Sequence, residues 1–141
     1  WQWLTSVTKT DATLNGVQLN AYDHAGLGTS TGLTLAMRLQ YQLTDQWLTG
    51  AGMRSVEGLH QVQTSAGLID QPGYSAFDAF ARWQSSQIEG LSLTFALRNL
   101  SDKWYRDQAT LPDFNHIPGY EGLAGLPEPG RDARVELAWW F

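Results

Sequence analysis

The sequence predicts an all-β protein: an antiparallel up-and-down meander of about six strands that forms part of a large transmembrane β-barrel. Apolar and polar residues alternate with period two in segments of about 9–11 residues, the length at which a tilted strand crosses a bilayer. Short turns alternate with long loops, as in bacterial outer-membrane barrels, where the turns are periplasmic and the loops extracellular. No stretch approaches the roughly 18 apolar residues of a membrane-spanning helix.

Composition agrees with a barrel wall and excludes several function classes. The chain has seven Trp although its mean hydropathy is below zero. This combination suits a barrel wall in which apolar and polar residues alternate along each strand. The absence of cysteine excludes thiolate metal sites, disulfides and cysteine nucleophiles. The net charge of −5 comes from scattered carboxylates, so no nucleic-acid partner is expected. Because the sequence starts at Trp1, without an initiator Met or a signal segment, we expect it to be a fragment of a longer protein.

The first third of the chain predicts two strands joined by a long loop. Residues 1–10 alternate as a strand whose beginning we expect to be missing. Residues 11–32 are rich in Asn, Gly, Asp, Thr and Ser and have no sustained period, which predicts a loop with His24 as a solvated side chain. Residues 33–41 alternate most cleanly, and a helix would spread their apolar residues around its whole circumference.

The next segment predicts a hairpin. Residues 43–46 form a short polar turn, and residues 47–56 run back as a strand. Gly50 and Gly52 lie inside this strand on the side opposite Trp47 and Met53. Because glycine weakens a strand interior, the pair indicates either a tight inner wall or a bulge.

The remaining elements repeat the alternation of loop and hairpin. Residues 57–72 form a second loop that carries His60, and residues 74–84 form a strand. A short turn over residues 85–90 leads to the strand 91–98. A third long loop, residues 99–129, contains five aromatic or imidazole side chains, Trp104, Tyr105, Phe114, His116 and Tyr120. At its start, Asn99 and Asp102 can cap a turn through their own side chains.

The terminal strand, residues 130–141, ends on three aromatics. Apolar residues recur at every second position, with Trp140 as the exception. Aromatics at a strand end suit a membrane interface, although an edge strand of a soluble sandwich remains open. If the wall faces lipid, one convex apolar face is expected, consisting of Leu35, Met37, Leu39, Leu93, Phe95, Leu97, Val135, Leu137 and Trp139. Because small barrels need about eight strands, the rest of the wall is expected upstream of Trp1.

Three blocks of the chain resemble the carboxyl-terminal part of TonB-dependent outer-membrane receptors, a family that imports ferric siderophores, haem, cobalamin and some glycans. The resemblance covers most of the chain from Leu33 onward. Ser101 departs from the family, where a bulkier residue is usual, and so does Trp140, where a polar or basic residue is common. The blocks are Pro72-Gly73-Tyr74-Ser75-Ala76-Phe77-Asp78, Asn99-Leu100-Ser101-Asp102-Lys103-Trp104-Tyr105-Arg106-Asp107 and Pro129-Gly130-Arg131.

The resemblance implies that residues 1–141 are the carboxyl-terminal part of a receptor barrel in the outer membrane of a Gram-negative bacterium. The plug domain, the TonB box and the upstream strands then lie outside this sequence. The implied function is TonB-dependent uptake of a scarce nutrient, a ferric siderophore ahead of haem, with no cofactor. The implied partners are outer-membrane lipid, the plug and the rest of the barrel, TonB, the barrel-assembly machinery, and a small iron chelate or haem.

Two groups of residues have roles under this resemblance. Trp104, Tyr105, His116, Tyr120 and His60 are candidate ligand contacts, because aromatic rings and imidazoles can touch a siderophore and one imidazole can ligate haem iron. The alternative for each is an ordinary solvated loop residue. Phe141, Trp139, Leu137 and Val135 are the candidate assembly signal that the barrel-assembly machinery of similar barrels recognises.

Two other function classes remain as alternatives. A passive outer-membrane pore or an adhesin barrel differs from a receptor mainly in whether the upstream sequence encodes a plug. An outer-membrane hydrolase needs Ser, His and a carboxylate together, but the three histidines lie in three different loops and no G-x-S-x-G is present. We therefore expect no enzyme. The sequence contains no pair of histidines at metal-ligand spacing and no compact cluster of carboxylates, so it predicts no metal site.

Overall fold

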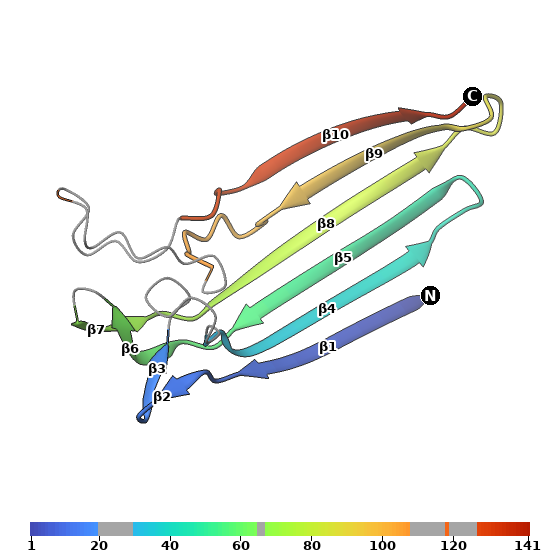
Figure 1. Ribbon diagram of the computed structural model, residues 1–141. Coiled ribbons are helices and arrows are strands. Elements are labelled where there is room, and N and C mark those ends of the chain that lie inside the picture. Colours follow the sequence, from blue (N-terminus) through green and yellow to red (C-terminus); the bar gives the residue numbers. More distant parts are fainter. Residues whose placement is uncertain (20–29, 65–66, 108–117, 119–126) are drawn as a thin grey trace.

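The computed structural model describes residues 1–19, 30–64, 67–107, 118 and 127–141. Six strands form one sheet in the order β1-β4-β5-β8-β9-β10, and every neighbouring pair is antiparallel (Figure 1). This confirms the predicted meander. The strands are β1 (Gln2–Thr10), β4 (Gly32–Gln42), β5 (Trp47–Val56), β8 (Tyr74–Gln84), β9 (Leu91–Arg98) and β10 (Asp132–Trp139). The described part of the chain contains no helix long and apolar enough to cross a membrane.

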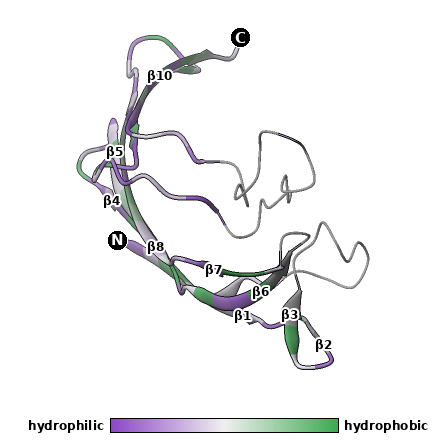
Figure 2. Ribbon diagram, turned by 90° about the vertical axis from the view of Figure 1, so that its left-hand side faces the viewer, coloured by the Kyte–Doolittle hydropathy of each residue, from purple (hydrophilic) through white to green (hydrophobic). Residues whose placement is uncertain are grey.

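The six-stranded sheet curves into a trough, and its polar face is the hollow one. Figure 2 shows the strands following an arc from β1 to β10. A cavity of about 480 Å³ opens on the face that carries Arg38, Arg54 and Arg82. The segment after β9 also folds over this face, because Tyr105 stacks on Tyr74. The opposite, apolar face is therefore convex.

The strand register places the predicted apolar residues on this convex face. Residues directly opposite each other in paired strands point to the same side of a sheet. One such row crosses all six strands and consists only of apolar side chains, Trp3, Leu39, Ala51, Ala79, Leu97 and Ala133. A second row joins four strands through Trp47, Trp83, Leu93 and Leu137.

No second layer covers the convex face in the described residues. Val135, Leu137 and Trp139 keep 67%, 69% and 60% of their surface exposed, and Leu39, Phe95 and Leu97 are also exposed. The few buried apolar side chains are Val56, Leu59, Val62, Tyr74 and Ala76, at and beyond the loop end of the sheet. The prediction of an outward apolar face is therefore confirmed, and a soluble sandwich with a packed interior is not the fold.

The apolar band on the convex face has bounded ends. From Tyr41 to Leu33 it covers eight residue steps of β4, or about 26 Å along the strand at a rise of about 3.3 Å. Toward the loops it gives way to Lys9, Ser55 and Ser75, which share this face. Toward the short turns it ends in aromatics, and the rings of Trp1 and Tyr41 lie 4.3 Å apart. The apolar bands of outer-membrane barrels are similar, about 25 Å tall with aromatic girdles.

Two segments predicted as loops contain strands, and there the prediction is wrong. β2 (Thr13–Leu14), β3 (Val17–Leu19), β6 (Leu59–Thr64) and β7 (Gly67–Gln71) form a second sheet in the order β2-β3-β6-β7, beyond the loop end of the first (Figure 1). The register shifts between Leu59 and Val62, and Gln61 has a φ of 55°. The buried side chains of β6 are therefore three residues apart rather than two, which hides the strand period.

The hairpin between β2 and β3 is also missed by a search for periodicity. Its two central residues, Asn15 and Gly16, have φ values of 52° and 81°. This left-handed pair is the connection that matches the twist of two antiparallel strands. Strands of two and three residues are too short to show an alternation, so the Asn-Gly pair is the only local signal.

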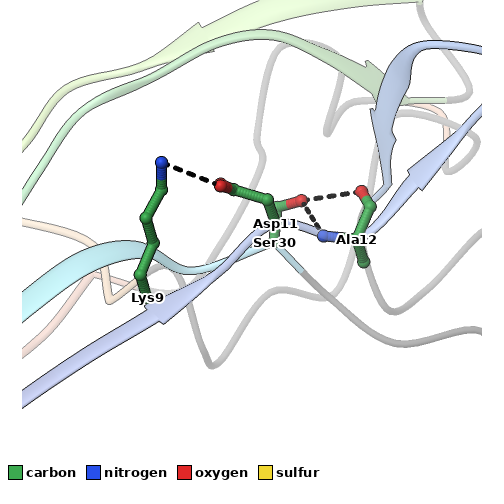
Figure 3. Close-up of polar contacts among 4 residues, drawn as sticks. All are labelled: Lys9, Asp11, Ala12 and Ser30. Carbon is green, nitrogen blue, oxygen red and sulfur yellow. Dashed lines mark hydrogen bonds and ion pairs between the residues drawn. The ribbon is translucent and has the colours of Figure 1, made fainter.

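Hydrogen bonds close the base of the segment between β1 and β4 (Figure 3). The buried Ser30 hydroxyl accepts a hydrogen bond from the Ala12 backbone N–H at 3.0 Å and donates one to the Ala12 carbonyl at 2.8 Å. Lys9 forms an ion pair with Asp11 at 3.0 Å beside them. The two ends of this segment are thus tied together at the rim of the sheet.

Both short turns form as predicted, and Gly50 lies at a tight point of the inner wall. The pairing around Gly50 is uninterrupted, with Gln40 on one side and Phe80 on the other, so the alternative of a bulge is wrong. A Cβ at Gly50 would lie 2.7 Å from the Leu39 carbonyl oxygen and would overlap the Phe80 ring. Glycine is needed here because the ring packs directly on the backbone.

We expect Gly50→Ala to destabilise the wall by about 1–3 kcal/mol, the usual cost of overpacking. Gly52→Ala is the matched control, because a Cβ there meets nothing closer than 3.7 Å. The measurement is the urea midpoint of the full-length protein that contains this chain, refolded in detergent. Equal midpoints for the two variants would show that the Phe80 ring does not require the glycine.

Candidate functional site

The candidate site lies at the loop end of the concave face, where the chain after β9 folds back over the wall. Arg54 comes from β5 and Tyr74 from the first position of β8. The wall side chains of this site meet Tyr105 and Asp107, which follow β9. The site is therefore assembled from residues more than fifty positions apart.

An ion pair and a ring stack hold this loop against the wall. Arg54 Nη1 donates to Asp107 Oδ2 at 2.8 Å, and the Asp107 side chain is only 14% exposed. The rings of Tyr74 and Tyr105 stack with centroids 4.1 Å apart and planes 18° apart. Burial raises the pKa of the Tyr105 hydroxyl, so this group stays a neutral hydrogen-bond donor at physiological pH. The two contacts place Tyr105 over the inner surface of the wall.

Asn99 fastens the two ends of the loop between β9 and β10. Its φ is 49°, and the residue is 3% exposed. Its backbone N–H donates to Asp78 Oδ1 at 2.9 Å, and its Nδ2 donates to the carbonyls of Lys103 and Pro129 at 2.8 and 3.3 Å. Its Oδ1 accepts from the Lys103 N–H at 3.0 Å. The predicted capping by Asn99 is confirmed, and it extends to the far end of the loop.

Asp102 makes a second connection across the same loop. Its φ is 52°, and its Oδ1 accepts a hydrogen bond from the Arg131 backbone N–H at 2.7 Å. A Cβ at Gly130 would lie only 2.8 Å from this oxygen. The Asp102 carboxylate therefore caps the start of the terminal strand. The prediction of a local turn at Asp102 did not include this contact with Arg131.

A polar cavity of about 300 Å³ lies beside these contacts. Both signs of charge line it, as do the amide of Asn99 and the phenol of Tyr105; the charged residues include Arg54, Asp78, Glu128 and Arg134. Such a lining can hold a polar ligand through hydrogen bonds and ion pairs. The described residues contain no group of three or more His, Cys, Asp or Glu side chains able to hold a metal ion.

The structure brings only part of the predicted contact set to this cavity. Tyr105 lines it, whereas Trp104 is 64% exposed with the Arg106 guanidinium 5.1 Å from its ring. His60 lies in β6 of the outer sheet and lines a different cavity. His116 and Tyr120, and also His24, lie outside the described residues.

His60 has an acidic neighbour rather than an aromatic one. Its Nδ1 lies 3.4 Å from Asp70 Oδ2 on the paired strand β7. The backbone N–H of Gln61 donates to Asp70 Oδ1 at 3.0 Å. This hydrogen bond, followed by His60, lowers the pKa of Asp70. The contact joins two exposed side chains of β6 and β7, whose backbone pairing holds the hairpin together.

The sequence reasoning missed Arg54, Tyr74, Asp78 and Asp107 as residues of the site. The inward position of Arg54 is visible in the strand period, but its partner follows 53 residues later in the chain. No local pattern connects the two. The site could have been predicted by asking which inward-facing polar side chains of the wall can pair with the first residues after β9.

Comparisons with known proteins bear on the fold. No protein-family model and no curated protein matches the chain. Among solved structures, it is similar to the ferric-catecholate import receptor Fiu of E. coli K12 in its closed form. The TM-score is 0.67 at 23% identity, and the match covers 98% of this chain and 18% of Fiu.

Two further solved structures give similar matches. For the copper transporter OprC the TM-score is 0.72 at 17% identity, with 99% of this chain and 21% of OprC covered. For the iron transporter FrpB of Neisseria meningitidis the TM-score is 0.63 at 20% identity, with 79% of this chain and 17% of FrpB covered. The chain thus spans about a fifth of the length of these proteins. All three are TonB-dependent receptors. The chain has the fold of a barrel-wall segment of a TonB-dependent receptor.

Proposed function

We propose that this chain is part of the barrel wall of a TonB-dependent receptor in the outer membrane of a Gram-negative bacterium. The observation that carries the proposal is the convex apolar face, which runs unbroken across six strands and stays exposed. Outer-membrane lipid is the partner for such a face, because water makes the exposure of so many apolar side chains unfavourable. The polar concave face then lines the lumen.

The proposed activity is uptake of a metal chelate, with a ferric siderophore ahead of haem. The similar solved structures are named for ferric catecholate, copper and iron, which supports a metal-containing ligand in general. A plug and a TonB-binding region would have to be supplied by the rest of the protein. A gene that encodes no plug would instead favour the passive pore or adhesin barrel.

We propose that ligand contact involves the loop between β9 and β10, with Trp104, Tyr105, His116 and Tyr120, and the outer sheet with His60. The support is the placement of Tyr105 at a polar cavity on the inner face. Aromatic faces and imidazoles provide contact area and hydrogen bonds at low entropic cost.

Replacing Trp104, Tyr105, His116 and Tyr120 together by Ala is expected to weaken ligand binding by the full-length receptor at least tenfold. Binding of a panel of ferric siderophores and haem would be measured by fluorescence quenching, with His60→Ala as a separate arm. If haem is the ligand and one of these imidazoles ligates its iron, His60→Ala or His116→Ala alters the Soret band of the bound complex. Unchanged affinity for every ligand in the fourfold variant would eliminate this loop as a binding element.

We also propose that Phe141, Trp139, Leu137 and Val135 form the signal read by the barrel-assembly machinery. These side chains are among the most exposed of the chain, and the Trp139 and Phe141 rings meet edge to face at 6.0 Å. An unpaired strand edge offers free backbone groups, while alternating side chains specify which face turns to lipid.

Deletion of Phe141 is expected to lower the amount of assembled receptor more than it lowers barrel stability. One interfacial ring contributes only about 1.5–3 kcal/mol through burial. The comparison is between heat-resistant folded barrel in membranes and the stability of the same variant refolded in detergent. Normal membrane levels after the deletion would mean that the ring has no role as a signal.

A further inference from the structure

The turn between β8 and β9 pairs with the end of the terminal strand. Residues 85–90 form this turn, and Figure 1 shows the C-terminus beside it. The last pair of the ladder between β9 and β10 joins Trp139 with Leu91. One residue further, the Trp140 backbone N–H donates a hydrogen bond to the Gly90 carbonyl at 3.1 Å. The pairing of the terminal strand therefore continues past the end of β10 into the turn.

Local hydrogen bonds shape this turn. The Ser85 hydroxyl accepts hydrogen bonds from the backbone N–H groups of Gln87 and Ile88 at 3.1 and 2.9 Å. The Leu91 N–H donates to the Ile88 carbonyl at 3.3 Å, and the Ser85 N–H donates to the Leu91 carbonyl at 3.0 Å. None of these four bonds involves β10, so the turn does not depend on the terminal strand for them. Gly90 thus belongs to a preformed edge on which the terminal strand closes.

Gly90 combines a left-handed backbone with a close approach to Trp140. Its φ is 75°, a region that favours glycine. A Cβ at Gly90 would also overlap the Trp140 carbonyl oxygen and lie 3.0 Å from its carbonyl carbon. Because these are backbone atoms, they cannot turn aside as the end of a long side chain can. Any other L-residue at position 90 must therefore push residue 140 away from the turn.

The backbone of Trp140 determines the direction of Phe141. Successive residues of a strand point to opposite faces, so residues 139 and 141 share a face only while residue 140 continues the strand. The rings of Trp139 and Phe141 do share one, since they meet at 6.0 Å with planes 65° apart. The Trp140 side chain is 79% exposed, so the contribution of this residue to the arrangement is made by its backbone.

We propose that Gly90 is a positioning residue for the assembly signal. By admitting the Trp140 backbone, Gly90 keeps Phe141 in the outward apolar row that the barrel-assembly machinery reads. This inference rests on the proposed function, in which Phe141, Trp139 and the apolar residues before them form that signal. A partner that reads alternate side chains is sensitive to such a displacement, because a strand that leaves its register turns its side chains to other positions.

The test uses the full-length receptor and compares two measurements. One is the amount of heat-resistant barrel in outer membranes, and the other is the refolding yield in detergent, where the assembly machinery is absent. Gly90→Ala and Gly90→Asn are expected to lower the first at least fivefold more than the second. Asn tolerates a left-handed backbone but has a Cβ, so the contact with Trp140 accounts for its loss.

Gly16→Ala is the matched control for backbone strain. Gly16 has a φ of 81°, close to that of Gly90, but a Cβ at Gly16 meets nothing within 4 Å. The variant imposes a similar strain without displacing a paired strand. It should assemble at the wild-type level.

A second pair of variants changes the other partner of the contact. Trp140→Pro removes the N–H that donates to the Gly90 carbonyl, whereas Trp140→Gln keeps it. The Pro variant should lose assembly as Gly90→Ala does, and the Gln variant should assemble close to wild type. This pair decides the matter if the Gly90 variants do not refold in detergent.

Three outcomes would overturn the inference. Wild-type assembly of Gly90→Asn would mean that position 90 requires only a left-handed backbone. Equal losses in membranes and in detergent would mean that Gly90 serves stability alone. Normal assembly of Trp140→Pro would mean that the bond to the turn has no role.

Deletion of Phe141, measured in parallel, separates this inference from the proposed function. If the deletion lowers assembly while the Gly90 variants assemble normally, the signal stands and the inference fails. If the deletion has no effect, the signal itself fails and the inference fails with it.

Discussion

Leu137→Arg is expected to abolish most of the assembled barrel in the membrane. Leu137 is 69% exposed and lies midway along the outward positions of the terminal strand, between Ala133 and Phe141. A cationic side chain at the middle of the lipid face of an outer-membrane barrel costs about 2–4 kcal/mol. The measurement is the fraction of heat-resistant folded protein in purified outer membranes.

Glu136→Arg is the control for this substitution. It introduces the same residue one position earlier, on the concave polar face of β10. Because this side chain meets a wet surface, the variant should assemble close to the wild-type level. If Leu137→Arg assembled as well as Glu136→Arg, the convex face would not contact lipid.

Asn99→Ala is expected to release the loop between β9 and β10. The substitution leaves the Lys103 N–H and the Lys103 and Pro129 carbonyls without the bonds that the Asn99 side chain makes. Each of these part-buried hydrogen bonds contributes about 0.5–1.5 kcal/mol, and Ala is also unfavourable at a φ of 49°. Cleavage within the loop by a protease should accelerate at least tenfold, and ligand affinity should fall with it.

Asn99→Gly separates the two contributions. Glycine accepts the left-handed backbone but makes no side-chain hydrogen bond. If the amide is the fastener, Asn99→Gly should be cleaved nearly as fast as Asn99→Ala. A return to wild-type resistance in Asn99→Gly would mean that the backbone conformation alone positions the loop.

The period-two pattern predicted the wall because alternate residues of one strand face opposite sides of the sheet, so that apolar and polar side chains follow each other in the sequence. Leu39 and Arg38 are neighbours in sequence, yet the register places them on opposite faces. The outer sheet could not be predicted in this way. A bulge in β6 changes the spacing of its buried residues, Leu59 and Val62, and the parallel pairing of β3 with β6 joins segments more than forty residues apart.

The candidate site was predicted only in part, since its contacts are not local. The aromatic residues after β9 indicated a binding loop, and Tyr105 does reach the inner cavity. The residues that hold it there are Arg54 and Tyr74, which precede Tyr105 by more than 30 residues in the chain. An inward-facing arginine looks the same in sequence whether or not it pairs with a loop carboxylate, as Arg54 does with Asp107.

The central claim is that the six-stranded sheet separates lipid from a wet lumen, and spin-label accessibility along β10 tests it most directly. The chain has no native cysteine, so single Cys substitutions from Ala133 to Trp139 can be labelled in the full-length receptor, in a background without other cysteines, and measured in outer-membrane vesicles. The accessibility of the spin label to oxygen should peak at positions 135, 137 and 139. At positions 134, 136 and 138 the label should instead be accessible to a water-soluble nickel chelate or be immobilised by neighbouring side chains. Absence of the alternation, or the reverse phase, would contradict the account.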